Sequence, residues 1–131
     1  MRIHHLGIAV GSLEAARPLF EKLLGKPPDS EEVVEEQKVR VAMFQVGESR
    51  LELLEATSAD SPISRFVAKR GEGVHHVALA VGDLAGTLRK LENDGVRLID
   101  HDPRRGAGGA QVAFVHPASA SGVLIELVEE K

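Results

Sequence analysis

The stretch that decides the fold occurs twice in the chain. It reads His5-Leu6-Gly7-Ile8-Ala9-Val10-Gly11-Ser12-Leu13, and 71 residues later the chain reads His76-Val77-Ala78-Leu79-Ala80-Val81-Gly82-Asp83-Leu84. In each copy an apolar, strand-like run ends at a glycine, and a side-chain oxygen that can cap a helix follows. Self-similarity at a fixed offset indicates a repeated structural unit. We therefore predict two copies of one module.

A helix is predicted after each copy of this stretch. Ser12 and Asp83 are the expected N-caps, and Gly25 and Gly95 are the expected ends. Apolar residues recur between them at helical spacing, which predicts one buried face in each helix. These residues are Leu13, Ala16, Leu19, Phe20, Leu23 and Leu24 in the first helix, and Leu84, Ala85, Leu88 and Leu91 in the second. Pro18 lacks a backbone donor, so we expect a kink or a loosened turn in the first helix.

Three further strands are predicted in each module. The correspondence continues from residues 41–44 to 112–114 and from residues 51–55 to 125–129. Each module then has the order strand, helix, strand, strand, strand. Ser61 followed by Pro62 predicts the start of a short linking helix. We expect a single domain over residues 1–131, with module 1 over about 1–58, the linking helix over about 61–70 and module 2 over about 73–131.

The composition excludes several classes of function. The chain has 131 residues, no cysteine, four phenylalanines as its only aromatic residues, and a net charge of −4 with 16 basic and 20 acidic residues. Thiolate metal sites are therefore excluded, and nucleic acid and membrane surfaces are not expected as partners. No run approaches the roughly 18 apolar residues of a membrane span. The N-terminus lacks the pattern of an export signal, so we expect a cytoplasmic location.

Four ionisable residues occupy matching positions within otherwise apolar strands. They are His5 and Glu52 in the first module, and His76 and Glu126 in the second. Charged groups on core-facing positions are costly unless they are paired or bind a metal. Two imidazoles and two carboxylates suit Zn²⁺, Co²⁺, Ni²⁺ or Mn²⁺ with coordination positions left open. For any one of them alone, a solvent-exposed face of a sheet is the simpler interpretation. The duplication favours a shared metal site.

The other four histidines receive different interpretations. By strand alternation, His4 and His75 point to the opposite face and have no predicted ligand role. His101 lies in a predicted loop and is expected at the surface. His116 ends a predicted strand, where a structural role and a place in a binding pocket are equally supported.

At this point the sequence resembles the vicinal oxygen chelate superfamily along its whole length. Within that superfamily it is most similar to the methylmalonyl-CoA epimerase family. The resemblance is carried by the ligand positions and by more specific strings, namely residues 60–63, 70–76, 106–109, 116–117 and 122–127, with Ser119. It implies an α+β fold in which two tandem βαβββ modules form an open, eight-stranded, barrel-like sheet around a metal-binding cleft.

The resemblance also implies an activity and its cofactor. The expected reaction interconverts (R)- and (S)-methylmalonyl-CoA by removal and return of the α-proton, through an enolate that one divalent ion stabilises. His5, Glu52, His76 and Glu126 are then the metal ligands, and Co, Zn, Ni, Mn and Mg are all compatible with them. Glu126 matches the family glutamate that is both ligand and proposed base. Some members carry a second, free glutamate where this chain has Val41, and Glu52 is the alternative.

Recognition of an acyl-CoA requires groups that bind phosphate. Arg104 and Arg105 precede the glycine-rich loop with Gly108 and Gly109, where exposed amides can receive an anion. Together with His116 they form the predicted substrate-binding set. The common family form has a lysine after the His-Pro pair, whereas Ala118 follows Pro117 here, which weakens an anion contact at that position. A homodimer is expected by family resemblance alone.

Two alternative functions fit the same fold. One is a lyase similar to glyoxalase I, which uses related enolate chemistry on the hemithioacetal of glutathione. The other is a metal-free protein that sequesters a small molecule such as an antibiotic. Retention of all four predicted ligands argues against the second alternative, because such a module has no need of them.

Overall fold

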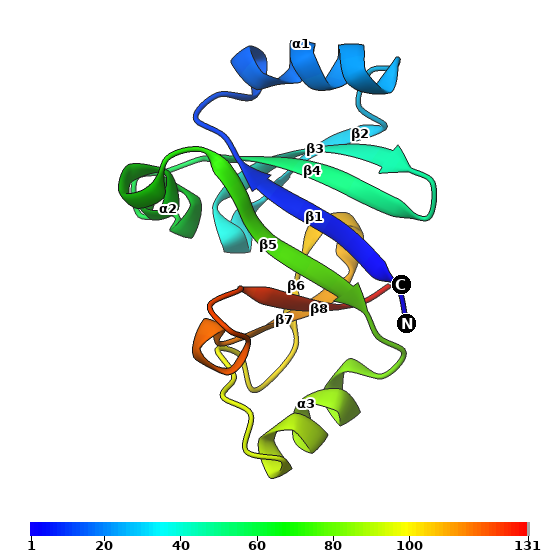
Figure 1. Cartoon of the computed structure of the whole chain (residues 1–131), viewed down its shortest axis with the longest axis vertical. Helices are drawn as coiled ribbons and strands as arrows, with labels where there is room; N and C mark the ends of the chain where they lie inside the picture. The colour runs from blue at the N-terminus through cyan, green and yellow to red at the C-terminus, as the bar shows by residue number, and fades with distance from the viewer. Residues whose placement is uncertain (131) are drawn as a thin grey trace. The chain divides into compact units, whose positions relative to one another are not determined.

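The computed structural model describes residues 1–130, and its elements repeat as the sequence predicts. The first module contains β1 (Ile3–Ala9), α1 (Leu13–Leu24), β2 (Ser30–Val34), the 3-10 turn η1 (Glu35–Gln37), β3 (Val39–Val46) and β4 (Ser49–Ala56). The linking helix is α2 (Pro62–Arg70). The second module contains β5 (Gly73–Ala80), α3 (Leu84–Asn93), β6 (Arg104–Arg105), the 3-10 turn η2 (Ala107–Gly109), β7 (Gln111–Val115), the 3-10 turn η3 (Pro117–Ser119) and β8 (Ile125–Glu129). The predicted pair of βαβββ modules is confirmed (Figure 1).

The strands follow the order β2-β3-β4-β1-β5-β8-β7-β6 in one hydrogen-bonded, eight-stranded sheet. In each module the first strand runs parallel to the last, β1 with β4 and β5 with β8, and the other pairs are antiparallel. By internal contacts the chain divides into two compact units. One comprises residues 5–75, and the other comprises residues 1–4 and the chain from residue 76 onward.

Each module buries one face of its sheet beneath its own helix. In the first unit, α1 packs on a core formed by Val10, Leu13, Ala42, Phe44 and Leu53. In the second unit, α3 packs on a core formed by Leu84, Leu88, Leu98, Ala113, Val115 and Leu127. We call this side of each strand the helix face, and the opposite side, which carries Glu52 or Glu126, the ligand face. Side chains alternate along a strand, so neighbouring residues serve the two faces in turn.

The predicted helix caps are confirmed, and a second capping group accompanies each of them. The Ser12 hydroxyl accepts a hydrogen bond from the backbone N–H of Ala15, and the Asp83 carboxylate accepts one from Gly86. In addition, the Glu55 carboxylate accepts a hydrogen bond of 2.6 Å from the N–H of Leu13. In the second module, Glu129 accepts one of 2.7 Å from Leu84. A carboxylate at a helix N-terminus satisfies a free donor and complements the helix dipole.

The first helix has the predicted bounds, Leu13–Leu24 between Ser12 and Gly25, with Pro18 inside it, and the kink expected at Pro18 stays a prediction. The prediction that Leu19 and Leu23 join the buried face is wrong, because these side chains are 58% and 69% exposed. At 3.6 residues per turn, both lie roughly 80 to 120° around the helix from the face that Leu13 begins. They are apolar residues on its solvent side.

The linking helix begins as predicted, at an N-cap serine followed by proline. The Ser61 hydroxyl accepts a hydrogen bond from the N–H of Ile63, and Pro62 occupies the first turn. Just before it, Asp60 accepts hydrogen bonds from the Lys38 ammonium and the Ser58 hydroxyl. These two donors, with Lys38 the larger cause, lower the pKa of Asp60 from 3.8 to about 2.

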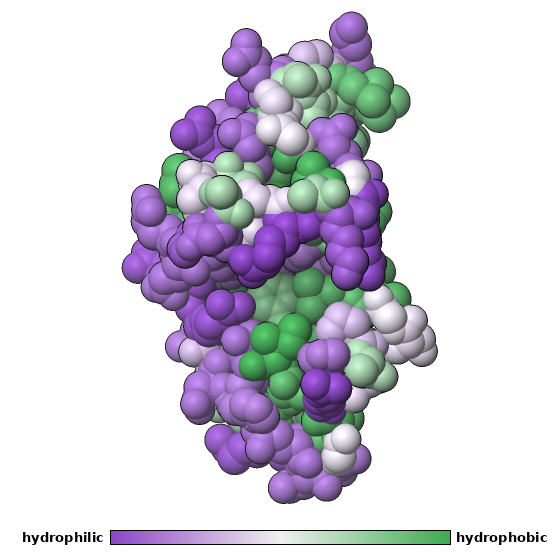
Figure 2. Space-filling model, turned by 90° about the vertical axis from the view of Figure 1, so that its left-hand side faces the viewer, coloured by the Kyte–Doolittle hydropathy of each residue, from purple (hydrophilic) through white to green (hydrophobic). Residues whose placement is uncertain are grey.

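No helix of residues 1–130 is suited to crossing a membrane. Within residues 1–130, each helix is too short or too polar to span a bilayer. Figure 2 shows one face of the molecule, on which hydrophilic side chains predominate and hydrophobic ones form smaller patches between them.

Candidate metal centre

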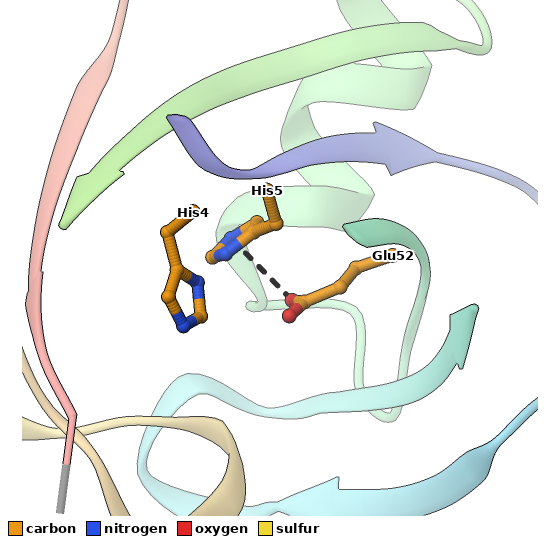
Figure 3. A group of neighbouring side chains, drawn as sticks. All are labelled: His4, His5 and Glu52. Atoms are coloured by element: carbon orange, nitrogen blue, oxygen red, sulfur yellow. Dashed lines mark ion pairs between the residues drawn. The ribbon is translucent and has the colours of Figure 1, made fainter. Parts of the chain in front are cut away.

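The ligand pair of the first module lies on two adjacent parallel strands. His5 on β1 and Glu52 on β4 point toward one another, and His5 Nε2 lies 3.4 Å from Glu52 Oε1 (Figure 3). The residue directly opposite Glu52 is Gly7, two positions after His5 and therefore on the same side of β1. Since glycine has no side chain, nothing on β1 stands between the imidazole and the carboxylate.

The second module repeats this arrangement. His76 on β5 and Glu126 on β8 approach to 2.9 Å between Nε2 and Oε1. Ala78 stands opposite Glu126, two positions after the histidine. Both modules therefore bring a histidine to a glutamate along a diagonal, past a glycine or an alanine that leaves the space open.

Burial makes these pairs unlike ordinary surface ion pairs. His5, Glu52, His76 and Glu126 are each only 4 to 5% exposed. An isolated buried carboxylate is costly, and a bound metal or a close partner offsets that cost. Imidazole nitrogen and carboxylate oxygen are suitable donors for a divalent first-row ion. The four predicted residues thus fit a metal site in both residue type and burial.

His4 differs from its prediction. Strand alternation predicts that it points away from the neighbouring pair, yet His4, His5 and Glu52 each offer a donor atom, and these atoms lie within 4.8 Å of one another (Figure 3). His4 and His5 are consecutive and both buried, which shows that both sides of β1 are covered at this point. His4 Nε2 also lies 3.5 Å from Glu130 Oε2. The structure therefore contains a His/Glu group that is able to bind a metal, with a histidine that the pattern missed.

The structure places two other histidines away from their module's ligand pair. His75 packs edge-on against the ring of Phe66 on α2, at 4.9 Å between ring centroids. His101 is exposed, as predicted, and its Nδ1 lies 2.8 Å from Glu92 Oε1.

The predicted substrate-binding residues lie in two places: Arg104, Arg105, Gly108 and Gly109 lie before the start of β7, whereas His116 follows its other end. Arg104 and Arg105 form β6, and they line a shallow hollow of about 380 Å³ together with Gly109. Gly108 and Gly109 both have positive φ, at 67° and 75°, conformations that favour glycine. His116 caps the short turn η3, because its Nδ1 accepts a hydrogen bond from the N–H of Ala118.

The position at which the family resemblance implies a free glutamate holds an apolar residue. Val41 is 3% exposed and pairs with Leu54 on β4 and with Glu32 on β2. On the ligand face of β4, Glu52 stands opposite Met43. Glu52 is thus the buried carboxylate that the first module offers.

Sequence reasoning missed Phe114 as a residue of the site. Its ring meets the ring of His76 edge-on, at 5.8 Å between centroids and an interplanar angle of 87°. A phenylalanine in an apolar strand is typical of core packing, so the pattern gave no signal. Its position opposite Glu126 could have been found from strand register alone.

Comparison with known proteins agrees with this geometry. Residues 4–114 match the model of the Glyoxalase/Bleomycin resistance protein/Dioxygenase superfamily. The uncharacterized protein YqjC of Bacillus subtilis is 47% identical over 130 residues, covering 99% of this chain and 93% of that protein. The mitochondrial methylmalonyl-CoA epimerase of Bos taurus is 33% identical over 127 residues, covering 96% of this chain and 73% of that protein.

A solved structure agrees equally well. The Streptomyces coelicolor methylmalonyl-CoA epimerase, a variant in complex with 2-nitronate-propionyl-CoA, superposes with a TM-score of 0.95 at 40% identity, over 99% of this chain and 94% of that one. The chain therefore belongs to the glyoxalase/bleomycin resistance protein/dioxygenase superfamily and, within it, to the family of the methylmalonyl-CoA epimerases.

Proposed function

We propose that this protein interconverts the (R) and (S) forms of methylmalonyl-CoA. The observation that carries the proposal is the pair of buried His–Glu contacts, one in each module and built in the same way. Relatives named methylmalonyl-CoA epimerase, at 33 to 40% identity over nearly the whole chain, support the choice of reaction.

The proposed metal site unites the two pairs. His5, Glu52, His76 and Glu126 would hold one divalent ion, because each module supplies one buried His–Glu pair built in the same way. A bound ion would supply electrophilic stabilisation of the enolate formed when the α-proton leaves. Cobalt, zinc, nickel, manganese and magnesium remain candidates, since the donor set accepts each of them.

Glu126 is the proposed proton acceptor. Glu126 is 4% exposed, so its carboxylate is shielded from water that would otherwise form hydrogen bonds to it. Inversion by the simplest route needs a second group on the other face of the α-carbon to return a proton. Because Val41 cannot do this, we assign the second role to Glu52, which would loosen from the metal to exchange a proton.

The assignment of Glu52 has its own test. Glu52→Gln keeps a metal-binding oxygen but removes the ability to carry a proton. We expect this variant to retain metal and to lose turnover. Full turnover with metal retained would refute the role.

Arg104, Arg105, Gly108, Gly109 and His116 are the proposed substrate-binding residues. The arginines line a hollow together with Gly109, and the backbone of a glycine-rich loop is able to receive an anion. Substitution of Arg105 by alanine should raise KM for methylmalonyl-CoA and leave kcat largely unchanged, because phosphate binding is remote from the reacting carbon. An unchanged KM would remove Arg105 from the set.

The decisive experiment is proton exchange in D₂O. The full chain is incubated with (S)-methylmalonyl-CoA and with Co²⁺, Zn²⁺, Ni²⁺, Mn²⁺ or Mg²⁺ in turn. We expect deuterium at the α-carbon together with racemisation, and loss of both in His76→Ala. Absence of exchange with every metal would refute the epimerase. Isomerisation of the glutathione hemithioacetal of methylglyoxal would then support the glyoxalase I alternative.

The proposal includes a homodimer, because members of the superfamily often pair. Light scattering after size exclusion should give about twice the chain mass of 14.1 kDa. A mass of one chain at working concentration would contradict it.

A further inference from the structure

The ring of Phe114 contacts the ligand pair of the second module. Phe114 on β7 is the cross-strand partner of Glu126 on β8, so both side chains lie on the ligand face. The same ring meets His76 edge-on at 5.8 Å, with an interplanar angle of 87°. This is a favoured aromatic geometry, in which the edge of one ring faces the π-surface of the other. Phe114 therefore restricts the orientation of the imidazole.

Two charged residues also contact Phe114, one at its ring and one at its backbone. The Arg104 guanidinium lies over the ring, with its central carbon 5.6 Å from the ring centroid. Arg104 is held by Asp100, at 3.1 Å between Nε and Oδ1. The other oxygen of Asp100 accepts a hydrogen bond of 2.8 Å from the backbone N–H of Phe114. One carboxylate thus fixes both the strand that carries the ring and the cation that covers it.

The first module has a different residue at this position. Opposite Glu52 stands Met43, an unbranched and flexible side chain without a ring face. The His–Glu distance is 3.4 Å in the first module and 2.9 Å in the second. The duplication has kept the ligands but has changed the residue that faces the glutamate.

We propose that Phe114, covered by Arg104 and anchored by Asp100, is a positioning residue that fixes the His76 imidazole for metal binding. The inference rests on the metal site proposed above, but not on the identity of the substrate. It also gives Arg104 a role at Phe114 in addition to the hollow that it lines with Arg105. Both arginines remain proposed contacts for the anionic ligand.

The test compares two phenylalanines that lie on opposite faces of the sheets. Phe114→Met imports the residue type of the first module, and Phe44→Met makes the same change on the helix face, where Phe44 is completely buried. The dissociation constant for Co²⁺ is measured by calorimetry on the full chain, with the visible absorption spectrum of bound Co²⁺. Outer-shell partners of a metal-binding histidine are typically worth about 10- to 100-fold in affinity.

We expect Phe114→Met to weaken Co²⁺ binding by about tenfold or more and to change the spectrum. Phe44→Met should lower the melting temperature and leave the dissociation constant and the spectrum unchanged. Phe114→Tyr, which keeps the ring, should restore affinity. An unchanged dissociation constant in Phe114→Met would overturn the inference, and so would equal weakening in both methionine variants.

A second variant separates the proposed effect from a failure to fold. A second measurement, on metal-free protein, tests the inference without a bound ion. Arg104→Gln changes an exposed side chain, and it should weaken Co²⁺ binding in the same direction but less. In metal-free protein, ¹H–¹³C NMR should show one sharp set of His76 ring signals, which become broadened or doubled in Phe114→Met. Unchanged ring signals refute the positioning role even if the wild type proves to lack epimerase activity. Conversely, the wild type could show no proton exchange while the His76 ring signals of wild type and Phe114→Met behave as expected. That result would refute the epimerase function and leave the positioning role of Phe114 in place.

Discussion

The buried pair of His76 and Glu126 should make the metal-free protein sensitive to removal of one partner but tolerant of removal of both. His76→Leu leaves Glu126, a carboxylate 4% exposed, without its imidazole 2.9 Å away. Removal of one partner of a buried ion pair costs about 3–5 kcal/mol. Glu126→Leu leaves an imidazole, which can be buried as a neutral ring, so the cost falls to about 1–3 kcal/mol.

The double variant should behave differently from the sum of its parts. Additivity of the two single variants would give a loss of about 4–8 kcal/mol. Replacing both partners by leucine instead removes both desolvated groups, and such replacements range from neutral to stabilising by about 1–4 kcal/mol. We therefore expect the double variant to be within about 1 kcal/mol of the wild type, or more stable, which implies a coupling energy of at least about 3 kcal/mol.

Urea unfolding at neutral pH in the presence of a chelator measures these differences. With a slope of about 2 kcal/mol per molar urea, His76→Leu should lower the midpoint by roughly 2 M. Added metal at a hundred times its dissociation constant should stabilise the wild type by about 2.7 kcal/mol, and the double variant far less. A double variant whose loss equals the sum of the single losses within about 0.5 kcal/mol would refute the reasoning.

Three further perturbations test other parts of the structure. Gly7→Val places a branched side chain opposite Glu52, and we expect at least tenfold weaker metal binding by calorimetry; wild-type affinity would show that the open space does not matter. Glu129→Gln weakens the charged cap of α3, and we expect a loss of about 0.5–2 kcal/mol in urea unfolding; no change in the midpoint would contradict the capping role. The pKa of Asp60 in the folded protein is lowered from 3.8 to about 2. The carboxylate therefore contributes to stability above pH 3.8, and this contribution is lost as the pH falls through about 2. NMR titration should show that midpoint, and a shift toward 3.8 in Lys38→Met; an unshifted midpoint would remove Lys38 as the main cause.

The sequence predicted the repeated parts of the fold and less of what lies between them. Ser12 and Asp83 act through their own next few residues, so local spacing was sufficient to identify them as caps. The His–Glu pairs were recognisable because duplication singled out four charged residues among apolar ones. Burial of Leu19 was predicted wrongly, because hydrophobicity shows which residues are apolar but not how wide a stripe the sheet covers.

The missed residues of the site depend on contacts between strands. His4 was set aside because alternation assumes one open face, whereas both sides of β1 are covered there. Phe114 is an apolar residue whose role follows from its partner across the sheet, not from its own neighbours in sequence. The second strand of the second module, β6, has only two residues, Arg104 and Arg105, because the glycine-rich loop follows it directly.

The two glutamates on β4 also have a consequence for folding. Glu52 and Glu55 are three residues apart, an odd spacing, so one carboxylate serves the ligand face and the other caps α1. Were β4 to pair with β1 one residue out of register, Glu52 would turn toward the hydrophobic core and the N–H of Leu13 would lose its acceptor. Glu126 and Glu129 impose the same condition on β8. The duplicated glutamates thus help to fix the register of β4 and β8. A shift of either strand by one residue would bury a carboxylate on one face and remove a helix cap on the other.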